Sequence, residues 1–197
     1  MTSPSPDDPA DVVVLVDETG QVLGTADRLR VHTDQTPLHL AFSSYLFDPA
    51  GRLLITRRAL GKKTWPGVWT NSCCGHLRPG ESPVQAATRR IAEELGAQAT
   101  GLRVVLPDFR YRAVDSGGIV ENELCPVLVG HIAEDIRPDP AEIAEHHFVE
   151  WDAFHTAGGA TPAVFSPWAV AQLAELGADH PLATAIATDS AGFLAAV

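Results

Sequence analysis

The sequence predicts one α+β domain in which a mixed β-sheet is flanked by helices. Short segments with the composition of strands dominate the first third of the chain and recur in the middle, and helical patterns stand among them without a regular strand–helix repeat. The chain has 197 residues, 45% of them hydrophobic, which is enough for one core of ordinary size. We therefore expect a single folded unit.

The two ends of the chain are expected to lie outside this unit. Residues 1–10 are rich in Pro, Ser and Asp and lack apolar periodicity, which is typical of a disordered leader. The expected domain spans residues 11–180. The alanine-rich residues 181–197 are expected to form a C-terminal tail that favours a short helix.

Two hairpins are expected at the start of the domain. Residues 12–16 and 21–25 flank a turn and predict an N-terminal hairpin. Residues 38–47 and 52–58 flank a second turn and predict another.

A loop, a helix and further strands follow. Residues 61–80 contain four glycines, two prolines and two tryptophans, which indicates a long ordered loop. Ser82 can cap the next helix, Pro83 suits its first turn and Gly96 can end it. The remaining expected elements are strands at 102–113, 119–132 and 147–151 and a helix at 166–176.

The charge of the chain excludes several kinds of partner. Its formal net charge is −11, from 14 Lys plus Arg against 25 Asp plus Glu, so neither nucleic acid nor an anionic membrane is an expected partner. No segment resembles a signal peptide or a membrane span, and three cysteines make a poor disulfide framework. We expect a cytoplasmic monomer that binds a small molecule. An anionic ligand must meet a local group of cations, and the densest contains Arg57, Arg58, Lys62 and Lys63.

The expected helix and the loop before it carry glycine, glutamate and arginine at fixed spacing. These residues are Gly75, Glu81, Arg89, Ile91, Glu93, Glu94 and Gly96. The pattern resembles the Nudix box, G-x5-E-x7-R-E-U-x-E-E-x-G with U aliphatic, in which a loop and helix present carboxylates to magnesium bound by a diphosphate. Mg²⁺ prefers hard oxygen ligands and is usually held by a few carboxylates together with substrate phosphates.

One position departs from the box. Arg90 stands where the box has its first helical glutamate, which replaces a metal-binding carboxylate with a cation. This weakens the multi-metal cluster that a hydrolase needs and leaves Glu94 able to hold one Mg²⁺. A solvated helix with ion pairs from Arg89 to Glu93 and from Arg90 to Glu94 would also show these charges, but the fixed spacing from Gly75 favours the box.

A second set of residues has the side chains of metal ligands. It consists of His32, His39, Cys74, His76, Glu121 and Glu123. Glu121 and Glu123 are two apart in a strand-like run, so both point to one face, where they repel unless a cation lies between them. Three histidines and two glutamates suit Mn²⁺, Mg²⁺ or Zn²⁺. Singly, each histidine is more often a surface or satisfied residue, and Cys74 a small buried apolar one.

Seven ordered motifs make a resemblance specific. They lie at residues 32–33 with 38–44, 56–59, 65–72, 74–76, 108–112, 121–123 and 165–168. Together they resemble the motifs of type I isopentenyl-diphosphate isomerases, which belong to the Nudix superfamily. The resemblance implies a Nudix-type fold and the interconversion of isopentenyl diphosphate and dimethylallyl diphosphate, with a proton added at carbon 4 and another lost from carbon 2.

The resemblance implies two metal sites. The larger one, for Mn²⁺, Mg²⁺ or Zn²⁺, would be formed by His32, His39, His76, Glu121 and Glu123. Glu94 would hold a second ion, Mg²⁺, on the substrate diphosphate.

The resemblance also implies the catalytic pair, Cys74 and Glu123, on opposite faces of the allyl unit. Spacing does not decide which of them is the acid. We favour Glu123, assisted by Tyr111, as the acid that protonates carbon 4 and the Cys74 thiolate as the base. Trp168 can place its indole face against the tertiary carbocation.

Cations for the diphosphate are implied at Arg28, Arg58 and Lys62. Arg28 stands where the family pattern leads us to expect lysine, which keeps the charge and changes the geometry. Cys73 replaces the small apolar residue expected beside the catalytic cysteine.

Two rival interpretations remain open at this point. A Nudix hydrolase of a diphosphate is favoured by the box and opposed by Arg90. A catalytically idle diphosphate-binding protein is opposed by the presence of Cys74, Glu121 and Glu123.

Overall fold

Strand β3 (His39–Phe47) is the axis of the fold, and all nine of its residues are buried. The computed structural model describes residues 11–133 and 135–184. Within them β3 pairs with β1 and β6 in antiparallel register, with β9 and β10 in parallel register, and at one position with β4. The expected leader, 1–10, and most of the expected tail, 185–197, lie outside the described residues.

The sheet around β3 is mixed, as the sequence predicts. Its longest path runs in the order β11-β4-β3-β1-β2, and the other strands branch from it. The remaining strands are β1 (Val12–Val16), β2 (Val22–Asp27), β4 (Leu53–Arg58), β5 (Trp69–Thr70), β6 (Cys73–His76), β7 (Ala99–Leu106), β8 (Arg110–Val114), β9 (Val120–Leu124), β10 (Val127–Ile132) and β11 (Ile143–Val149). The helices are α1 (Pro83–Leu95), α2 (Trp151–Ala160), α3 (Pro167–Leu176) and α4 (Pro181–Thr184), with a 3₁₀ turn, η1, at Pro162–Val164.

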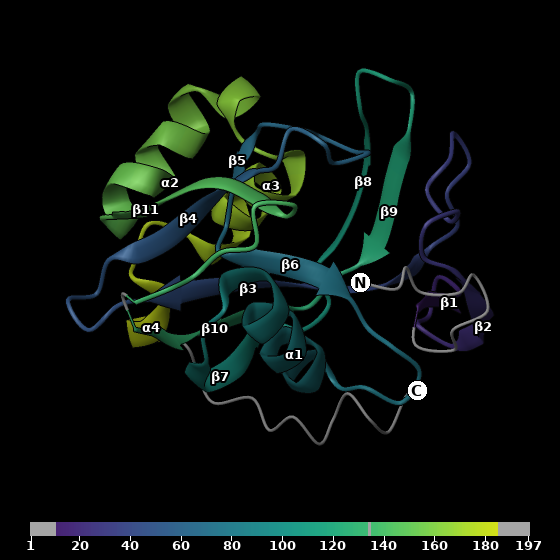
Figure 1. Cartoon of the computed structure of the whole chain (residues 1–197), viewed down its shortest axis with the longest axis horizontal. Coiled ribbons are helices and arrows are strands. Elements are labelled where there is room, and N and C mark those ends of the chain that lie inside the picture. The colour runs from purple at the N-terminus through teal and green to yellow at the C-terminus, as the bar shows by residue number, and fades with distance from the viewer. Residues whose placement is uncertain (1–10, 134, 185–197) are drawn as a thin grey trace.

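Side chains alternate along β3 and bury against a helix on each face. Phe42 and Leu46 belong to a cluster that includes Ile91 of α1, whereas Tyr45 belongs to a cluster that includes Phe154 of α2. Figure 1 shows α1 on one side of β3 and α2 with α3 on the other. Because both faces are covered, the polar side chains of β3, those of His39, Ser43 and Ser44, are buried along with the apolar ones.

Helix α1 forms as its local sequence predicts. Ser82 Oγ accepts a hydrogen bond from the Gln85 amide, and Gln85 Oε1 accepts one from the Ser82 amide at 2.8 Å, which completes a capping box. Gly96 ends the helix in the left-handed conformation, with φ of 60°. None of the described helices has the length and apolar content needed to cross a membrane.

The first predicted hairpin is confirmed, and the second is right only at its turn. Strands β1 and β2 pair along their length. Asp48 closes the second turn by accepting hydrogen bonds from the amides of Ala50 and Arg52. Beyond the pair Phe47–Leu53, β3 and β4 separate, because β6 occupies the next positions on β3 and β5 and β11 pair with β4.

Several further segments differ from the sequence-based expectation. The strands expected at 102–113 and 119–132 are each divided in two, β7 with β8 and β9 with β10, and Trp151, expected at the end of a strand, begins α2. The expected loop at 61–80 contains the short strands β5 and β6, which are too brief to show a period of two. Helix α2 was not predicted, because its two adjacent glycines are typical of loops. At Gly158 an added Cβ would lie 2.4 Å from Leu173 Cδ1 on α3, so the glycine lets Leu173 pack closely against α2.

The C-cap of α1 gives a prediction about stability. Gly96→Ala should lower the free energy of unfolding by more than about 1 kcal/mol, because alanine is strained at positive φ. Its Cβ would also lie 2.6 Å from the Arg137 carbonyl oxygen. Gly80→Ala is the matched control, since Gly80 has φ of 79° and no atom within 4 Å of the added Cβ. Urea denaturation should show a larger loss for Gly96→Ala; equal losses would contradict the role of the Arg137 contact.

Candidate active site

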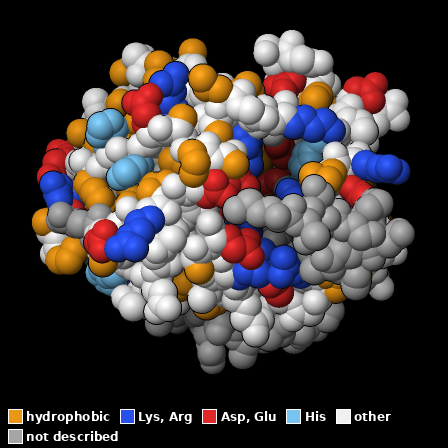
Figure 2. Space-filling model, in the orientation of Figure 1, with side chains coloured by type: hydrophobic (Ala, Val, Ile, Leu, Met, Phe, Trp, Pro, Cys, Tyr) orange, Lys and Arg blue, Asp and Glu red, His pale blue; other side chains and the backbone are white. Residues whose placement is uncertain are grey.

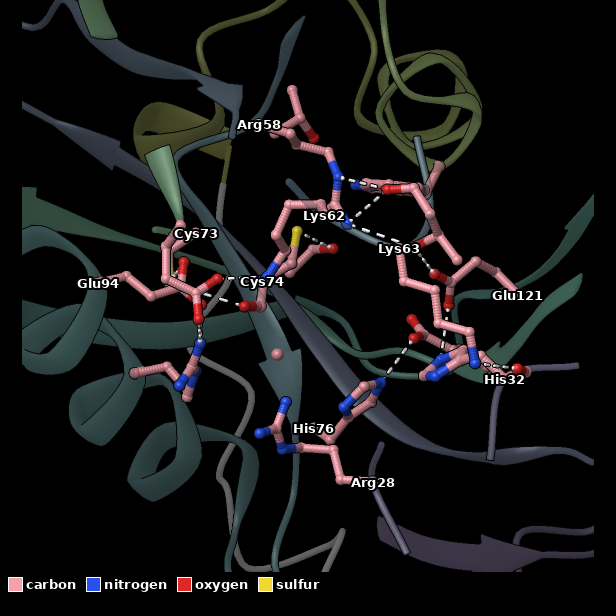
Figure 3. A pocket seen from close by; sticks show the side chains of 18 of the residues that line it. Arg28, His32, Arg58, Lys62, Lys63, Cys73, Cys74, His76, Glu94 and Glu121 are labelled. Atoms are coloured by element: carbon pink, nitrogen blue, oxygen red, sulfur yellow. Dashed lines mark hydrogen bonds and ion pairs between the residues drawn. The ribbon is translucent and has the colours of Figure 1, made fainter. Parts of the chain in front are cut away.

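A cavity of about 440 Å³ lies where β6, β9, α1, α3 and the connection between β4 and β5 meet. Figure 2 shows it as a recess with acidic side chains and a histidine inside and basic side chains at its border. Figure 3 shows these groups from close by. All of the site residues predicted from the sequence line this cavity except His39, which lies beneath it against His76, with ring centroids 4.9 Å apart.

Five of the predicted residues form one group of ligand atoms, called the His/Glu group below. It consists of His32, His39, His76, Glu121 and Glu123, and one ligand atom from each lies within 4.8 Å of every other. Sheet register explains the convergence of three of them, because β3 lies between β6 and β9. His39 is paired with Glu123 on β9, and Ala41, two residues along β3, is paired with His76 on β6.

The His/Glu group has the chemistry of a site for a divalent cation. His39 Nδ1 donates to the Pro37 carbonyl oxygen at 2.9 Å, so its Nε2 lone pair points into the group. The Nε2 atoms of His32 and His39 are buried without a hydrogen-bond partner. They lie 3.1 Å from Glu121 and 3.6 Å from Glu123, in contacts that lack hydrogen-bond geometry. Buried nitrogen lone pairs beside two carboxylates are the donor set that such a cation requires.

Glu123 joins this group to the predicted catalytic residues. Its Oε1 lies 3.2 Å from His76 Nε2, and its Oε2 accepts a hydrogen bond from Tyr111 at 2.9 Å. Burial alone would raise the pKa of Glu123, but the imidazoles of His39 and His76 outweigh burial and hold that pKa well below its usual range. Burial and the neighbouring carboxylate raise the pKa of Tyr111 well above its usual value. The group therefore contains a carboxylate with a neutral phenol beside it.

Cys74 lies among polar side chains that set the direction of its thiol proton. Asn71 donates from Nδ2 to the carbonyl oxygens of Ser44 and Cys73, at 3.0 and 3.2 Å, so its Oδ1 must face the other way. The Cys74 thiol donates to this Oδ1 at 3.1 Å. Burial raises the pKa of Cys74 to about 11. Burial therefore favours the thiol form of Cys74.

Trp168 forms the aromatic wall of the cavity. It is 3% exposed, and its ring centroid lies 5.7 Å from that of Tyr111 and 5.6 Å from that of Trp65. The guanidinium carbon of Arg58 lies 5.3 Å from the Trp168 ring centroid. The aromatic wall and a predicted diphosphate cation are therefore in contact.

The predicted diphosphate residues line the cavity, and three of them pair with charged side chains of opposite sign. Arg28 pairs with Asp11 and Lys62 with Glu142. Glu94 is 9% exposed and pairs with Arg90, which also lies 3.3 Å from Glu142.

Several residues of the cavity could not be identified from the sequence. Arg90 stood out only as a departure from the box and Lys63 only as a member of the basic cluster, and no local signal marks Ser43, Thr64 and Glu142, or Asn71 behind Cys74.

The arginine of the box has a structural contact that its spacing did not reveal. Arg89 donates to both oxygens of Glu81, at 2.7 and 2.8 Å, and to the His76 carbonyl oxygen at 3.2 Å. Its contact with Glu93 is longer, at 3.5 Å. Arg89 therefore anchors α1 to the strand that carries Cys74 and His76.

Comparison with known proteins identifies the family. A family model described as the NUDIX domain matches residues 37–169. The isopentenyl-diphosphate Delta-isomerase of Frankia alni is 56% identical over 177 residues, which cover 89% of this chain and 91% of that protein. The protein of the same name from Mycolicibacterium vanbaalenii is 54% identical, over 84% of this chain and 91% of its own. This chain belongs to the isopentenyl-diphosphate Delta-isomerase family.

Solved structures agree on the fold of this family member. DR0079 from Deinococcus radiodurans superposes with a TM-score of 0.65 and 16% identity, over 83% of this chain and 98% of that one. The MutT protein from Methanosarcina mazei gives a TM-score of 0.55, also at 16% identity, over 71% of this chain and 92% of that one. The predictions of a Nudix-type α+β fold and of an enzyme of the isopentenyl-diphosphate isomerase family are confirmed.

The surroundings of Cys74 predict how this isomerase family member titrates. With a pKa of about 11, only about one Cys74 side chain in a thousand should be a thiolate at about pH 8. The difference in ultraviolet thiolate absorbance between the wild type and Cys74→Ala, measured on metal-free protein as the pH rises, should therefore appear only well above neutrality. A full thiolate signal near neutral pH would contradict the dominant effect of burial on this thiol.

Proposed function

We propose that this chain interconverts isopentenyl diphosphate and dimethylallyl diphosphate by protonation at carbon 4 and deprotonation at carbon 2, through a tertiary carbocation. One observation carries the proposal beyond family membership. A thiol, Cys74, and a carboxylate, Glu123, line the same cavity as the aromatic wall and the cations Arg58 and Lys62. An alkene is a weak base, so its protonation depends on such positioned groups.

We propose that the His/Glu group holds Mn²⁺, Mg²⁺ or Zn²⁺, and that Glu94 holds Mg²⁺ together with the diphosphate. A cation in the His/Glu group would lower the proton affinity of Glu123 and fix its orientation. For Glu94 to take this role, its pairing with Arg90 must open, which would release Arg90 toward the diphosphate. Burial raises the pKa of Glu94, so a bound cation would also relieve the cost of its buried charge.

The hydrogen bonds support an order of proton transfer opposite to the one favoured from the sequence. The Cys74 thiol is proposed to protonate carbon 4, because it carries a proton that Asn71 orients. Glu123 is proposed to accept the proton from carbon 2, because a carboxylate that ligates a metal is deprotonated. Tyr111 holds the Glu123 carboxylate in place through its hydroxyl.

The carbocation needs a stabilising surface and protection from water. The indole face of Trp168 is proposed to supply about 2 kcal/mol of cation–π stabilisation in a desolvated site. Trp65 and the connection between β4 and β5 lie over the same wall and are proposed to exclude water, which would otherwise trap the cation as an alcohol. Because Arg58 contacts Trp168, the diphosphate and the carbocation would occupy neighbouring parts of the cavity.

The acidity of the surface supports a small anionic substrate over a polymeric one. We propose that the chain acts as a cytoplasmic monomer, and neither nucleic acid nor a membrane takes part. The net charge of −11 opposes both of these partners, while the cations near the cavity offer a local site for a diphosphate.

Proton NMR in D₂O tests the reaction directly. Purified chain with isopentenyl diphosphate and Mg²⁺ should give dimethylallyl diphosphate with deuterium in a methyl group. Cys74→Ala and Glu123→Gln should each abolish turnover, because each removes one of the two groups that move protons.

The same experiment separates the rivals. Release of inorganic phosphate would indicate a hydrolase, and binding with an unchanged spectrum would indicate an idle binding protein. Circular dichroism of both variants is the control for folding. Near-wild-type activity in either variant would refute the proposed pair.

A further inference from the structure

His32 is the one member of the His/Glu group that no strand positions. The other four lie on β3, β6 and β9, whereas His32 lies in irregular chain between β2 and β3. Its backbone is held from across the cavity, since Lys63 Nζ donates to the His32 carbonyl oxygen at 2.6 Å. Lys63 belongs to the connection between β4 and β5, residues 59–68, called the β4–β5 connection below.

The next residue of this connection contacts a second member of the group. Thr64 is 6% exposed, and its Oγ1 lies 2.7 Å from Glu121 Oε1 and 3.3 Å from Arg58 Nη2. A guanidinium can only donate, so the single Thr64 hydroxyl proton must go to Glu121. The chain of hydrogen bonds therefore runs in one direction, from Arg58 to Thr64 to Glu121, as Figure 3 shows for the labelled Arg58 and Glu121.

This bond determines which oxygen of Glu121 faces the metal ligands. With Oε1 engaged by Thr64, Oε2 lies 3.1 Å from His32 Nε2. Thr64 and Lys63 thus act on two members of the His/Glu group from adjacent positions. Partners of this kind orient metal ligands and commonly change metal affinity by about 10-fold to 100-fold when they are lost.

The same part of the connection is also held by Arg58, a predicted diphosphate cation. Arg58 donates to the carbonyl oxygens of Thr64 and Trp65, with Nη2 at 3.0 Å from the former and Nε at 3.2 Å from both. Among the described residues Trp65 is the non-glycine residue with positive φ, at 42°. Such a backbone persists only where its surroundings fix it. A change that displaces Thr64 should therefore also displace the Arg58 guanidinium, which donates hydrogen bonds to this part of the connection.

We propose that Thr64 and Lys63 are positioning residues that couple cation binding in the His/Glu group to the ordering of the β4–β5 connection and of Arg58. The coupling rests on the metal site proposed above. By thermodynamic reciprocity, an ordered connection favours cation binding as much as the bound cation favours the ordered connection. Cation binding in the His/Glu group would thereby order Arg58, which lies in the part of the cavity proposed to bind the diphosphate.

Mn²⁺ titration of the metal-free protein tests the coupling, with free Mn²⁺ followed by electron paramagnetic resonance. Thr64→Val keeps the shape and removes the hydroxyl, and it should weaken Mn²⁺ binding by about 10-fold or more. Thr64→Ser keeps the hydroxyl and should bind Mn²⁺ with nearly the affinity of the wild type. Lys63→Met removes the exposed donor to His32 without risk to the core and should also weaken binding.

A second readout is amide hydrogen exchange in residues 59–68. Mn²⁺ should slow exchange there in the wild type and in Thr64→Ser, and much less in Thr64→Val. Unchanged Mn²⁺ affinity in Thr64→Val and Lys63→Met, with loss of the same ion in His76→Ala, would overturn the coupling and leave the proposed metal site standing. Equal Mn²⁺ binding by the wild type and His76→Ala would instead overturn the metal site, and the coupling with it.

Discussion

Two buried carboxylates, Glu121 and Glu123, impose the constraint on which the rest of the site depends. They are 6% and 7% exposed and lie two residues apart on β9. Buried like charges are costly unless cations or hydrogen-bond donors surround them. The fold meets this requirement by placing three imidazoles, the Tyr111 hydroxyl and the Thr64 hydroxyl around them. Strand β3 makes this arrangement achievable, because it pairs with β6 and β9 at the same time.

The cavity of this acidic chain has two parts that differ in charge. One part gathers carboxylates and imidazoles, whereas the other gathers Arg58, Lys62 and Arg90. In the second part Glu142 contacts both Lys62 and Arg90, and Glu94 contacts Arg90, so the cations are already arranged by internal anions. A diphosphate with its magnesium ion presents a similar mixture of charges. Exchange of one set of ion pairs for another costs less than desolvating free cations.

What the sequence could predict was local or periodic. The caps of α1 are formed by Ser82, Gln85 and Gly96, all within or next to the helix, so a short stretch of sequence is enough to predict them. The prediction that Glu121 and Glu123 point to one face follows from the two-residue period of a strand. Helix α2 and strands β5 and β6 depend on contacts distant in sequence, such as Gly158 against Leu173, and were missed. Thr64 and Asn71 are ordinary polar residues in a loop-like segment, and only the folded chain shows what their side chains contact.

The orientation of the Asn71 side-chain amide connects the strand pairing to the Cys74 thiol. Its NH₂ group is committed to the carbonyl oxygens of Ser44 on β3 and Cys73 on β6, so the strand pairing itself directs Oδ1 toward the Cys74 thiol. Trp168 and Thr70 donate to the same oxygen, at 3.2 and 2.8 Å, which makes rotation of the amide costly. An acceptor held in this way gives the thiol a fixed hydrogen-bond partner. Glu123 is held in the opposite sense, as a carboxylate that accepts from Tyr111 and faces imidazoles. One backbone arrangement therefore brings a thiol and a carboxylate together in the same cavity.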